Sequence, residues 1–321
     1  MEALELVQAG NAGALAPVVD AARLFASAAK APRTLDAYRA DWRTFCAWCD
    51  RMGLPSLPAS PQTVALYLTA RAQEGRKVAT ISRELAAISQ AHLLAGHPSP
   101  RSAGPVREVL KGIRRTLGTA QTQKAPLMGP ELRQVLEALP QGLLGLRDRA
   151  LLLVGFSGAF RRSELVGLEV RDVRFGKEGL TVTLRRSKTD QEGAGRTVAL
   201  PYSGTPDACP VRALRAWLDA ASIQQGTLMR SVSRHGAVST RPLTGRAVAL
   251  VVQRACAAAG LEAARYAGHS LRAGMATTAA RRGKSEAAIM RQTGHRSVAM
   301  VRRYIRDADL WRDNASAGLL D

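Results

Sequence analysis

A polar segment without periodicity, residues 118–126, divides the chain into two parts with different sequence patterns. Before it, apolar residues recur at three- and four-residue steps, as on one face of an α-helix. After it, helical patterns are interrupted by two segments that alternate in polarity as β-strands do. A chain of 321 residues is long enough for two domains. The sequence therefore predicts an arm (1–27), a helical domain (28–117), a linker (118–126) and a mixed domain (127–321).

The first domain is predicted to contain four helices, punctuated by glycines. Ser60-Pro61 is typical of a helix start, with serine as the cap and proline at the first position. In the third helix one apolar stripe runs from Ile81 to His92. The predicted helices span residues 34–51, 61–73, 79–94 and 105–117.

The second domain is predicted to be mainly helical with a small antiparallel sheet. Residues 180–186 and 196–200 alternate as strands, and the glycine-containing segment 190–195 between them predicts a hairpin tip. The predicted helices span residues 130–139, 145–156 and 161–168, and the chain from 211 onward is mostly helical.

The charge points to a polyanionic partner. Lys and Arg number 46 against 26 Asp and Glu, for a net charge of +20. Residues 1–124 hold 16 basic and 9 acidic side chains and residues 125–321 hold 30 and 17, so both parts are basic. An excess spread over two domains suits a protein that encloses nucleic acid, because neutralised phosphates release counterions. An anionic membrane surface is the alternative that charge alone leaves open.

Several other function classes lack their signature. Gly283-Lys284-Ser285 imitates the end of a phosphate-binding loop, but Thr278 stands where its first glycine is required. Cys46 and Cys49 have no second pair to complete a zinc site, which favours ordinary packing, and His92, His97 and His235 have no partner pattern. No metal and no cofactor are predicted.

The chain has no apolar run as long as a membrane span and begins with an acidic segment, unlike a signal peptide. The expected location is therefore the cytoplasm, for a protein of bacterial, phage or plasmid origin that associates with the nucleoid.

One set of residues in the second domain stands out by its order along the chain. His269 and Arg272 are three apart and share one face of a helix that begins near Gly268. His295 and Tyr304 are nine apart, which leaves room for a short helix and a turn. Each motif alone is common, but their joint order in a basic two-domain chain is much harder to obtain by chance. The set consists of Arg161, Lys188, His269, Arg272, His295 and Tyr304, with Glu164 three residues after Arg161.

These residue types suit phosphodiester exchange without a metal. Guanidinium groups stay charged and match two phosphate oxygens at once, and imidazoles add further donors. A phenol with an ordinary pKa of ~10 attacks phosphorus if its proton is accepted, and it leaves a covalent link. Lys188 on the hairpin is a candidate donor of the proton that the departing oxygen needs, and Glu164 a candidate to orient a guanidinium.

These motifs resemble the tyrosine recombinase or phage integrase family. The segment Phe156–Leu165 is similar to the family's first arginine box, and its R-x-S-E register selects Arg161 over Arg162. The segments Gly268–Gly274 and Gly294–Tyr304 resemble the second and third boxes. The resemblance covers residues 30–321 and is strongest to the Cre branch, although His295 stands where Cre carries tryptophan.

The resemblance implies a two-domain DNA clamp, in which a helical SAM-like core-binding domain joins a catalytic domain. It also implies four protomers on two inverted-repeat sites in double-stranded DNA, a 3′-phosphotyrosine on Tyr304, a tail (306–321) that docks on a neighbouring protomer, and an optional accessory protein. The candidate DNA contacts are Arg33, Thr34, Arg43, Ser82, Arg83, Thr244 and Arg246.

Three alternatives remain open from the sequence. A type IB topoisomerase shares this chemistry, and a non-catalytic DNA-binding regulator could keep the same shape. A transposase with an acidic triad is the weakest alternative, because the carboxylates are scattered along the chain.

Overall fold

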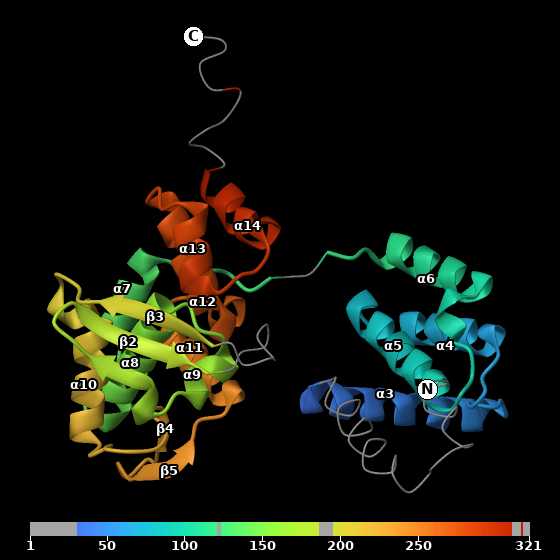
Figure 1. Cartoon of the computed structure of the whole chain (residues 1–321), viewed down its shortest axis with the longest axis horizontal. Helices are drawn as coiled ribbons and strands as arrows, with labels where there is room; N and C mark the ends of the chain where they lie inside the picture. Colours follow the sequence, from blue (N-terminus) through green and yellow to red (C-terminus); the bar gives the residue numbers. More distant parts are fainter. Residues whose placement is uncertain (1–30, 121–122, 186–194, 310–315, 317–321) are drawn as a thin grey trace, which may run out of the picture. The chain divides into compact units, whose positions relative to one another are not determined.

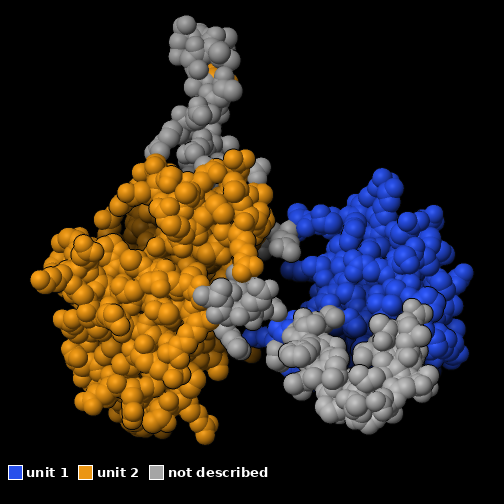
Figure 2. All heavy atoms as spheres, in the orientation of Figure 1, with its two compact units in different colours: residues 1–122 blue, residues 123–321 orange. Residues whose placement is uncertain are grey.

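The chain forms two compact units, residues 1–122 and 123–321, in a computed structural model that describes residues 31–120, 123–185, 195–309 and 316 (Figure 1, Figure 2). The boundary between the units lies inside the polar segment 118–126. The predicted arm, the hairpin tip and most of the predicted tail lie outside the described residues.

The described part of unit 1 is helical, as the periodicity predicted. Ser60 caps α4, and its Oγ accepts a hydrogen bond from the backbone N–H of Thr63 at 3.0 Å. The core lies between the helices, where the rings of Phe45 and Tyr67 meet edge to face with centroids 5.0 Å apart. Its helices are α3 (Pro32–Met52), α4 (Pro61–Gln73), α5 (Val78–Leu94) and α6 (Gly104–Leu117).

Cys49 packs in the core of unit 1 as predicted, and His92 is a packing residue there as well. His92 is buried; its Nε2 accepts from the backbone N–H of Ala59 at 2.9 Å, and its Nδ1 lies 2.8 Å from the carbonyl of Ile88. Cys46 and Cys49 are free thiols, and burial raises the pKa of Cys49 to about 11. A thiol held in its protonated form is a poor nucleophile and a poor metal ligand.

Unit 2 packs its helices around a three-stranded antiparallel sheet of order β1-β2-β3. Leu180 of β2 pairs with Leu200 of β3, and Val182 pairs with Val198, so one face of the sheet is apolar and buried. The elements are α7 (Gly129–Glu137), α8 (Leu143–Ser157), α9 (Arg162–Gly167), β1 (Val173–Phe175), β2 (Gly179–Leu184), β3 (Arg196–Pro201), α10 (Pro210–Ala220), β4 (Arg230–Val232), β5 (Val238–Pro242), α11 (Gly245–Ala258), α12 (Gly268–Arg281), α13 (Glu286–Thr293) and α14 (Val298–Asp309).

The predicted fold class is confirmed: the described chain is mainly helical with small antiparallel sheets. The strand β1 and the β4–β5 ribbon were not predicted. Both β1 and β4 have only three residues, too few for an alternating pattern to be recognised. No helix among the described residues is long and apolar enough to cross a membrane.

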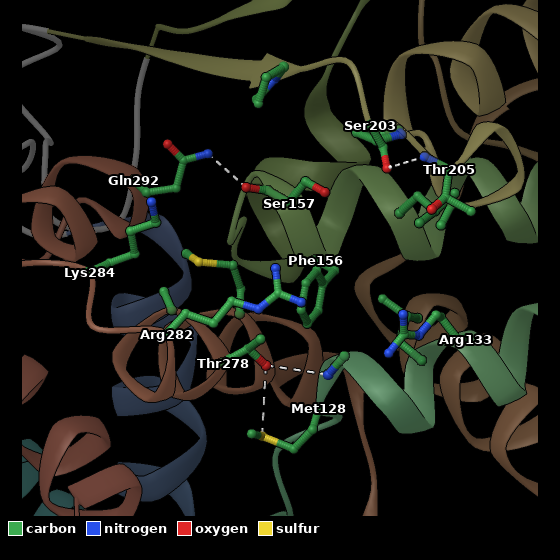
Figure 3. A pocket seen from close by; sticks show the side chains of 18 of the residues that line it. Met128, Arg133, Phe156, Ser157, Ser203, Thr205, Thr278, Arg282, Lys284 and Gln292 are labelled. Atoms are coloured by element: carbon green, nitrogen blue, oxygen red, sulfur yellow. Dashed lines mark hydrogen bonds between the residues drawn. The ribbon is translucent and has the colours of Figure 1, made fainter.

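A groove of about 770 Å³ opens on unit 2, between α7, the end of α8, β3 and the helices α12 and α13 (Figure 3). Met128, Phe156 and Met275 contribute apolar side chains to its lining. Arg282 and Lys284 add positive charge to it.

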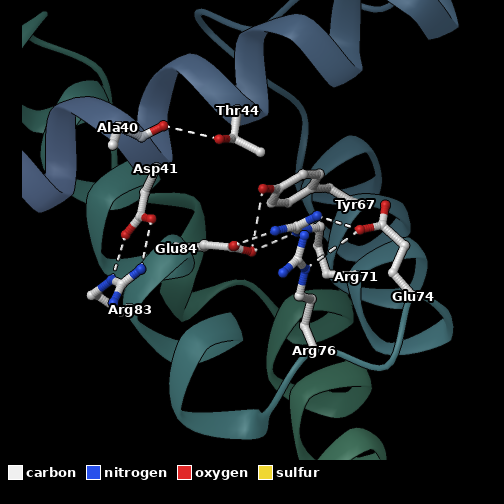
Figure 4. Close-up of polar contacts among 9 residues, drawn as sticks. All are labelled: Ala40, Asp41, Thr44, Tyr67, Arg71, Glu74, Arg76, Arg83 and Glu84. Atoms are coloured by element: carbon white, nitrogen blue, oxygen red, sulfur yellow. Dashed lines mark hydrogen bonds and ion pairs between the residues drawn. The ribbon is translucent and has the colours of Figure 1, made fainter. Parts of the chain in front are cut away.

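The core of unit 1 also contains a buried ion pair (Figure 4). Glu84 receives two hydrogen bonds from Arg71, from Nε at 3.0 Å and from Nη2 at 2.7 Å, and a third from the Tyr67 hydroxyl at 3.3 Å. The side chains of Arg71 and Glu84 are only 9% and 3% exposed, so neither charge is hydrated by bulk water. The pair therefore ties α4 to α5 from within the core.

Replacing Arg71 by methionine is expected to lower the free energy of unfolding by about 3 kcal/mol, because it leaves the Glu84 carboxylate buried without its cation. This is the lower end of the usual cost, since Tyr67 continues to donate. Arg76→Met is the matched control, because Arg76 is 54% exposed and lies 3.7 Å from Glu74. Urea unfolding of the full chain measures both, and equal losses would contradict the prediction.

Candidate active site

The corner between α8 and α9 holds the first arginine. Arg161 immediately precedes α9, and its backbone N–H donates to Glu164 Oε2 at 2.9 Å. Its Nη1 donates to Glu164 Oε1 at 2.5 Å, so one buried carboxylate fixes both the backbone and the guanidinium of this residue. Arg162 instead reaches the carbonyl of Gly245 at 3.5 Å. Of these two neighbouring arginines, Arg161 is therefore the one that the Glu164 carboxylate holds.

The start of α12 supplies His269 and Arg272. Arg272 is 1% exposed, and its Nη1 donates to the carbonyl of Ala159 at 2.6 Å. Ala159 has φ +48°, an unfavourable conformation for a residue with a Cβ. This backbone conformation directs the carbonyl of Ala159, at the corner between α8 and α9, toward Arg272 of α12.

The α13–α14 region brings His295 and Tyr304 to the same place. The Tyr304 hydroxyl lies 3.4 Å from Nε2 of His269, and its ring stacks on that of His295 with centroids 5.9 Å apart and planes at 29°. Val301 of α14 is buried against Ala276 of α12, which holds the tyrosine-bearing helix on the site.

Positive charge dominates the electrostatics of this cluster. Burial and then the nearby Arg161 lower the pKa of Arg272 to about 10. Burial and then Arg272 lower the pKa of His295 to about 4. The pKa of His269 is also lowered, by partial loss of hydration and then by Arg272, although its ring remains exposed. Both imidazoles are therefore neutral near pH 7.

Several buried donors of the site have no hydrogen-bond partner among the described residues. They include Nη2 of Arg272, Nε and Nη2 of Arg196, and a ring nitrogen, Nδ1, of His295. Buried polar nitrogens are ordinarily satisfied, so those of Arg272 and His295, beside Tyr304, indicate a site for an anion with several acceptor oxygens. A phosphodiester has this chemistry.

Lys188 was predicted for the site from the sequence, whereas Arg196 was not. Lys188 lies outside the described residues. Arg196 was missed, and it lies 3.6 Å from Glu164 through its Nη2. It occupies the same face of β3 as Val198 and Leu200, which are buried. An arginine on the inward face of a strand is the signal that could have identified it.

The predicted DNA contacts are mostly exposed. Arg33, Thr34 and Arg43 of α3 and Arg246 of α11 point to solvent, whereas Ser82 is half-buried. Two of the set have partners within the protein. Arg83 donates from Nε and Nη2 to both oxygens of Asp41, at 2.7 and 3.0 Å (Figure 4), and Thr244 caps α11 by accepting from the N–H of Ala247 at 3.1 Å.

The lowered pKa of His295 predicts a pH-dependent contribution to stability. The unfolded chain binds a proton at this side chain near pH 6.5, whereas the folded chain does so only near pH 4. Between these values the unfolded state holds more protons, so the free energy of unfolding falls as the pH falls. Urea unfolding at pH 7, 5.5 and 4.5 measures the free energy of unfolding of wild type and of His295→Gln. The wild-type value minus the variant value should become smaller toward low pH. A constant difference would contradict this.

The comparisons with known proteins agree with this geometry. Residues 127–310 match the family described as "Phage integrase family", and residues 22–93 match "Phage integrase, N-terminal SAM-like domain". An "Integrase/recombinase xerD homolog" of Selenomonas ruminantium is 41% identical over 290 residues, which cover 89% of this chain and 85% of that protein. "Recombinase cre" of Escherichia phage P1 is 26% identical over 286 residues, which cover 83% and 82%.

Solved structures share the fold. A lambda integrase (75–356) dimer bound to a COC′ core site has a TM-score of 0.58 at 21% identity, covering 89% of this chain and 92% of that one. The Tn1549 transposon integrase with transposon right end DNA has a TM-score of 0.61 at 15% identity, covering 88% and 92%. The two matched family regions support one family assignment. The relative that is 41% identical over most of both chains supports the same assignment. The chain belongs to the phage integrase family of tyrosine recombinases, enzymes of site-specific DNA recombination.

Proposed function

We propose that this recombinase cuts and rejoins DNA through a 3′-phosphotyrosine link formed by Tyr304, without a metal or ATP. The observation that carries the proposal is the tyrosine hydroxyl 3.4 Å from a neutral histidine, in a site where the buried Arg272 has a donor, Nη2, without a hydrogen bond among the described residues. We assign the phosphate contacts to Arg161, Arg272 and His295, and the orientation of Arg161 to Glu164.

The proposed step exchanges one phosphoester bond for another. The Tyr304 oxygen attacks phosphorus while the bond from phosphorus to the 5′-oxygen breaks. We assign the acceptance of the phenolic proton to His269, which is neutral at pH 7 and lies 3.4 Å from the Tyr304 hydroxyl. The leaving oxygen takes a proton, which we assign to Lys188. The 5′-hydroxyl of a second strand then reverses the step and releases Tyr304, so the energy of the original bond is retained in the link.

Covalent trapping tests this mechanism. The full chain is incubated in EDTA with nicked duplexes from its own genetic neighbourhood, and the products are separated on a denaturing gel. A protease-sensitive adduct whose DNA-linked peptide contains Tyr304 is expected. Relaxation of plasmids without any target site would favour a type IB topoisomerase. Binding without an adduct, while a known family member traps its own site alongside, would favour a DNA-binding regulator.

We further propose that residues 28–117 and 127–321 act as the two halves of a clamp on bacterial DNA with inverted-repeat sites. The basic charge of both parts supports this assignment. Base and phosphate contacts are assigned to the exposed α3 and α11 positions given above, and to Ser82 and Arg83. An accessory protein that sets the direction of recombination is part of the same proposal.

Four protomers are proposed to assemble through the tail. Residues 306–321 carry Leu310, Trp311, Leu319 and Leu320, and the groove on α12 and α13 offers apolar side chains to receive such a segment from a neighbouring copy. A chain truncated after Asp309 is expected to form the adduct on single sites but no complexes of two sites on native gels. Ala288→Trp places a large side chain in the groove. It should likewise form the adduct on single sites but no complexes of two sites. Wild-type synapsis by both variants would refute this interface.

A further inference from the structure

Arg196 joins three parts of the candidate active site. It opens β3, opposite Leu184 of β2, and its side chain is 19% exposed. Nη1 donates to the carbonyl of Gln292 at 2.9 Å and reaches that of Arg291 at 3.4 Å, which places the guanidinium at the end of α13. Nη2 lies 3.6 Å from Oε2 of Glu164, the carboxylate that holds Arg161.

The same guanidinium also packs against the turn that carries His295. Gly294 ends α13 with φ +66°, and a Cβ at this position would lie 2.8 Å from Nε of Arg196. The positive φ and the close approach of the guanidinium together favour glycine at this position. The backbone at residues 291–294 is therefore held by two carbonyl contacts and one steric contact to a single arginine, immediately before His295.

This arginine is poorly placed for stability alone. Burial lowers its pKa, Glu164 raises it and Arg161 lowers it again, so its charge is only partly compensated. Its Nε and Nη2 are buried without a hydrogen bond among the described residues. A buried cation with unpaired donors is costly, which indicates that something other than folding retains it.

The helix α13 has contacts with the rest of unit 2 besides those of Arg196. Gln292 Nε2 donates to the carbonyl of Ser157 at 2.7 Å (Figure 3) and to that of Ala199 at 3.2 Å. Ile289 adds a buried apolar contact from the same helix. These contacts tie α13 to α8, β3 and α12, so we expect a variant without the Arg196 guanidinium to retain the fold.

We propose that Arg196 is a positioning residue of the cleavage site, fixing the turn before His295 relative to the Glu164 carboxylate and hence to Arg161. Its effect on cleavage rests on the proposed function. Its effect on the turn does not. The guanidinium acts from behind the groups that touch the phosphate, as outer-shell partners do around other sites.

The test compares Arg196→Ala with Arg185→Ala. Arg185 immediately follows β2, the central strand paired with β3, and contacts Asp172 at 2.8 Å with 51% of its side chain exposed. Its removal therefore deletes the same group from this end of the sheet but not from the site. Single-turnover formation of the Tyr304 adduct should slow about 10- to 100-fold in Arg196→Ala, the usual loss for an outer-shell partner, and remain unchanged in Arg185→Ala. Affinity for DNA and the melting temperature should match wild type in both.

Three further readouts separate positioning from a general structural effect. Guanidinium ion at millimolar concentration should restore part of the rate of Arg196→Ala, whereas NaCl at equal ionic strength should not. Combined with Glu164→Gln, the loss should be less than the product of the single losses, because both changes release the same group. Hydrogen exchange at the amides of residues 293–296 should accelerate in Arg196→Ala but not in Arg185→Ala.

The possible outcomes distinguish the positioning role of Arg196 from the proposed cleavage by Tyr304. A wild-type rate in Arg196→Ala, or unchanged exchange at the turn, overturns the inference and leaves the proposed function intact. Accelerated exchange in a protein whose wild type forms no adduct supports the positioning role and refutes the proposed chemistry. If Arg196→Ala melts early, Arg196→Met retains the aliphatic packing, and a wild-type rate in this stable variant again overturns the inference.

Discussion

The Tyr304→Phe variant is expected to bind its DNA as wild type does and to form no covalent adduct. The change removes one oxygen and leaves the ring that stacks on His295, so the site keeps its shape. Removal of a nucleophilic side chain costs on the order of 10⁶-fold in rate, more than any other change considered for this chain. The measurement is the trapping gel described above, with affinity measured in parallel.

The tyrosines elsewhere in unit 2 provide the control. Tyr202 lines the groove near β3, and Tyr266 is buried in the core before α12, so neither belongs to the cluster of His269, Arg272 and Tyr304. Tyr202→Phe should form the adduct at the wild-type rate. An adduct that persists in Tyr304→Phe and disappears in another tyrosine variant would assign the nucleophile elsewhere and undo the proposed arrangement of the site.

The fold could be predicted from the sequence wherever one face of an element is buried. The stripe from Ile81 to His92 and the serine cap of α4 are local patterns, and both lie in the structure as predicted. The ribbon of β4 and β5 has mixed exposure and short strands, so its pairing depends on tertiary contacts that no local pattern records. Local periodicity predicts amphipathic elements and fails for short exposed ones.

Local sequence patterns predict some residues of the candidate site, whereas others are identified only by the folded structure. Motif spacing predicted one helix for His269 and Arg272, and both lie in α12. The register favoured Arg161 over Arg162, and Arg161 is the one whose guanidinium contacts Glu164. Arg196 carries no motif, because its partners lie 95 and 96 residues away in the chain, at Arg291 and Gln292. Only the folded structure brings that strand to the end of α13.

The second large effect is expected from Arg272→Met. Its Nη2 is buried beside Arg161 and is unpaired among the described residues, as a donor to a phosphate oxygen would be before DNA binds. Loss of one such donor slows a reaction about 10²- to 10³-fold, and loss of the whole fork should approach the upper value. Adduct formation in a single turnover measures the rate, and a loss under 10-fold would contradict the assignment.

Stability distinguishes this role from an ordinary buried arginine. Arg272 has a lowered pKa because burial and Arg161 disfavour its charge, so methionine at this position should cost little or even stabilise the free protein. Arg147→Met is the matched control, because Arg147 is 4% exposed but pairs with Asp148 at 2.6 Å, and its loss should lower the melting temperature. Target DNA should raise the melting temperature of Arg147→Met as much as that of wild type, and that of Arg272→Met less. The Arg272 charge, which destabilises the free protein, would then be the charge that binds the phosphate. An equal rise in melting temperature with DNA in wild type and both variants would refute this role.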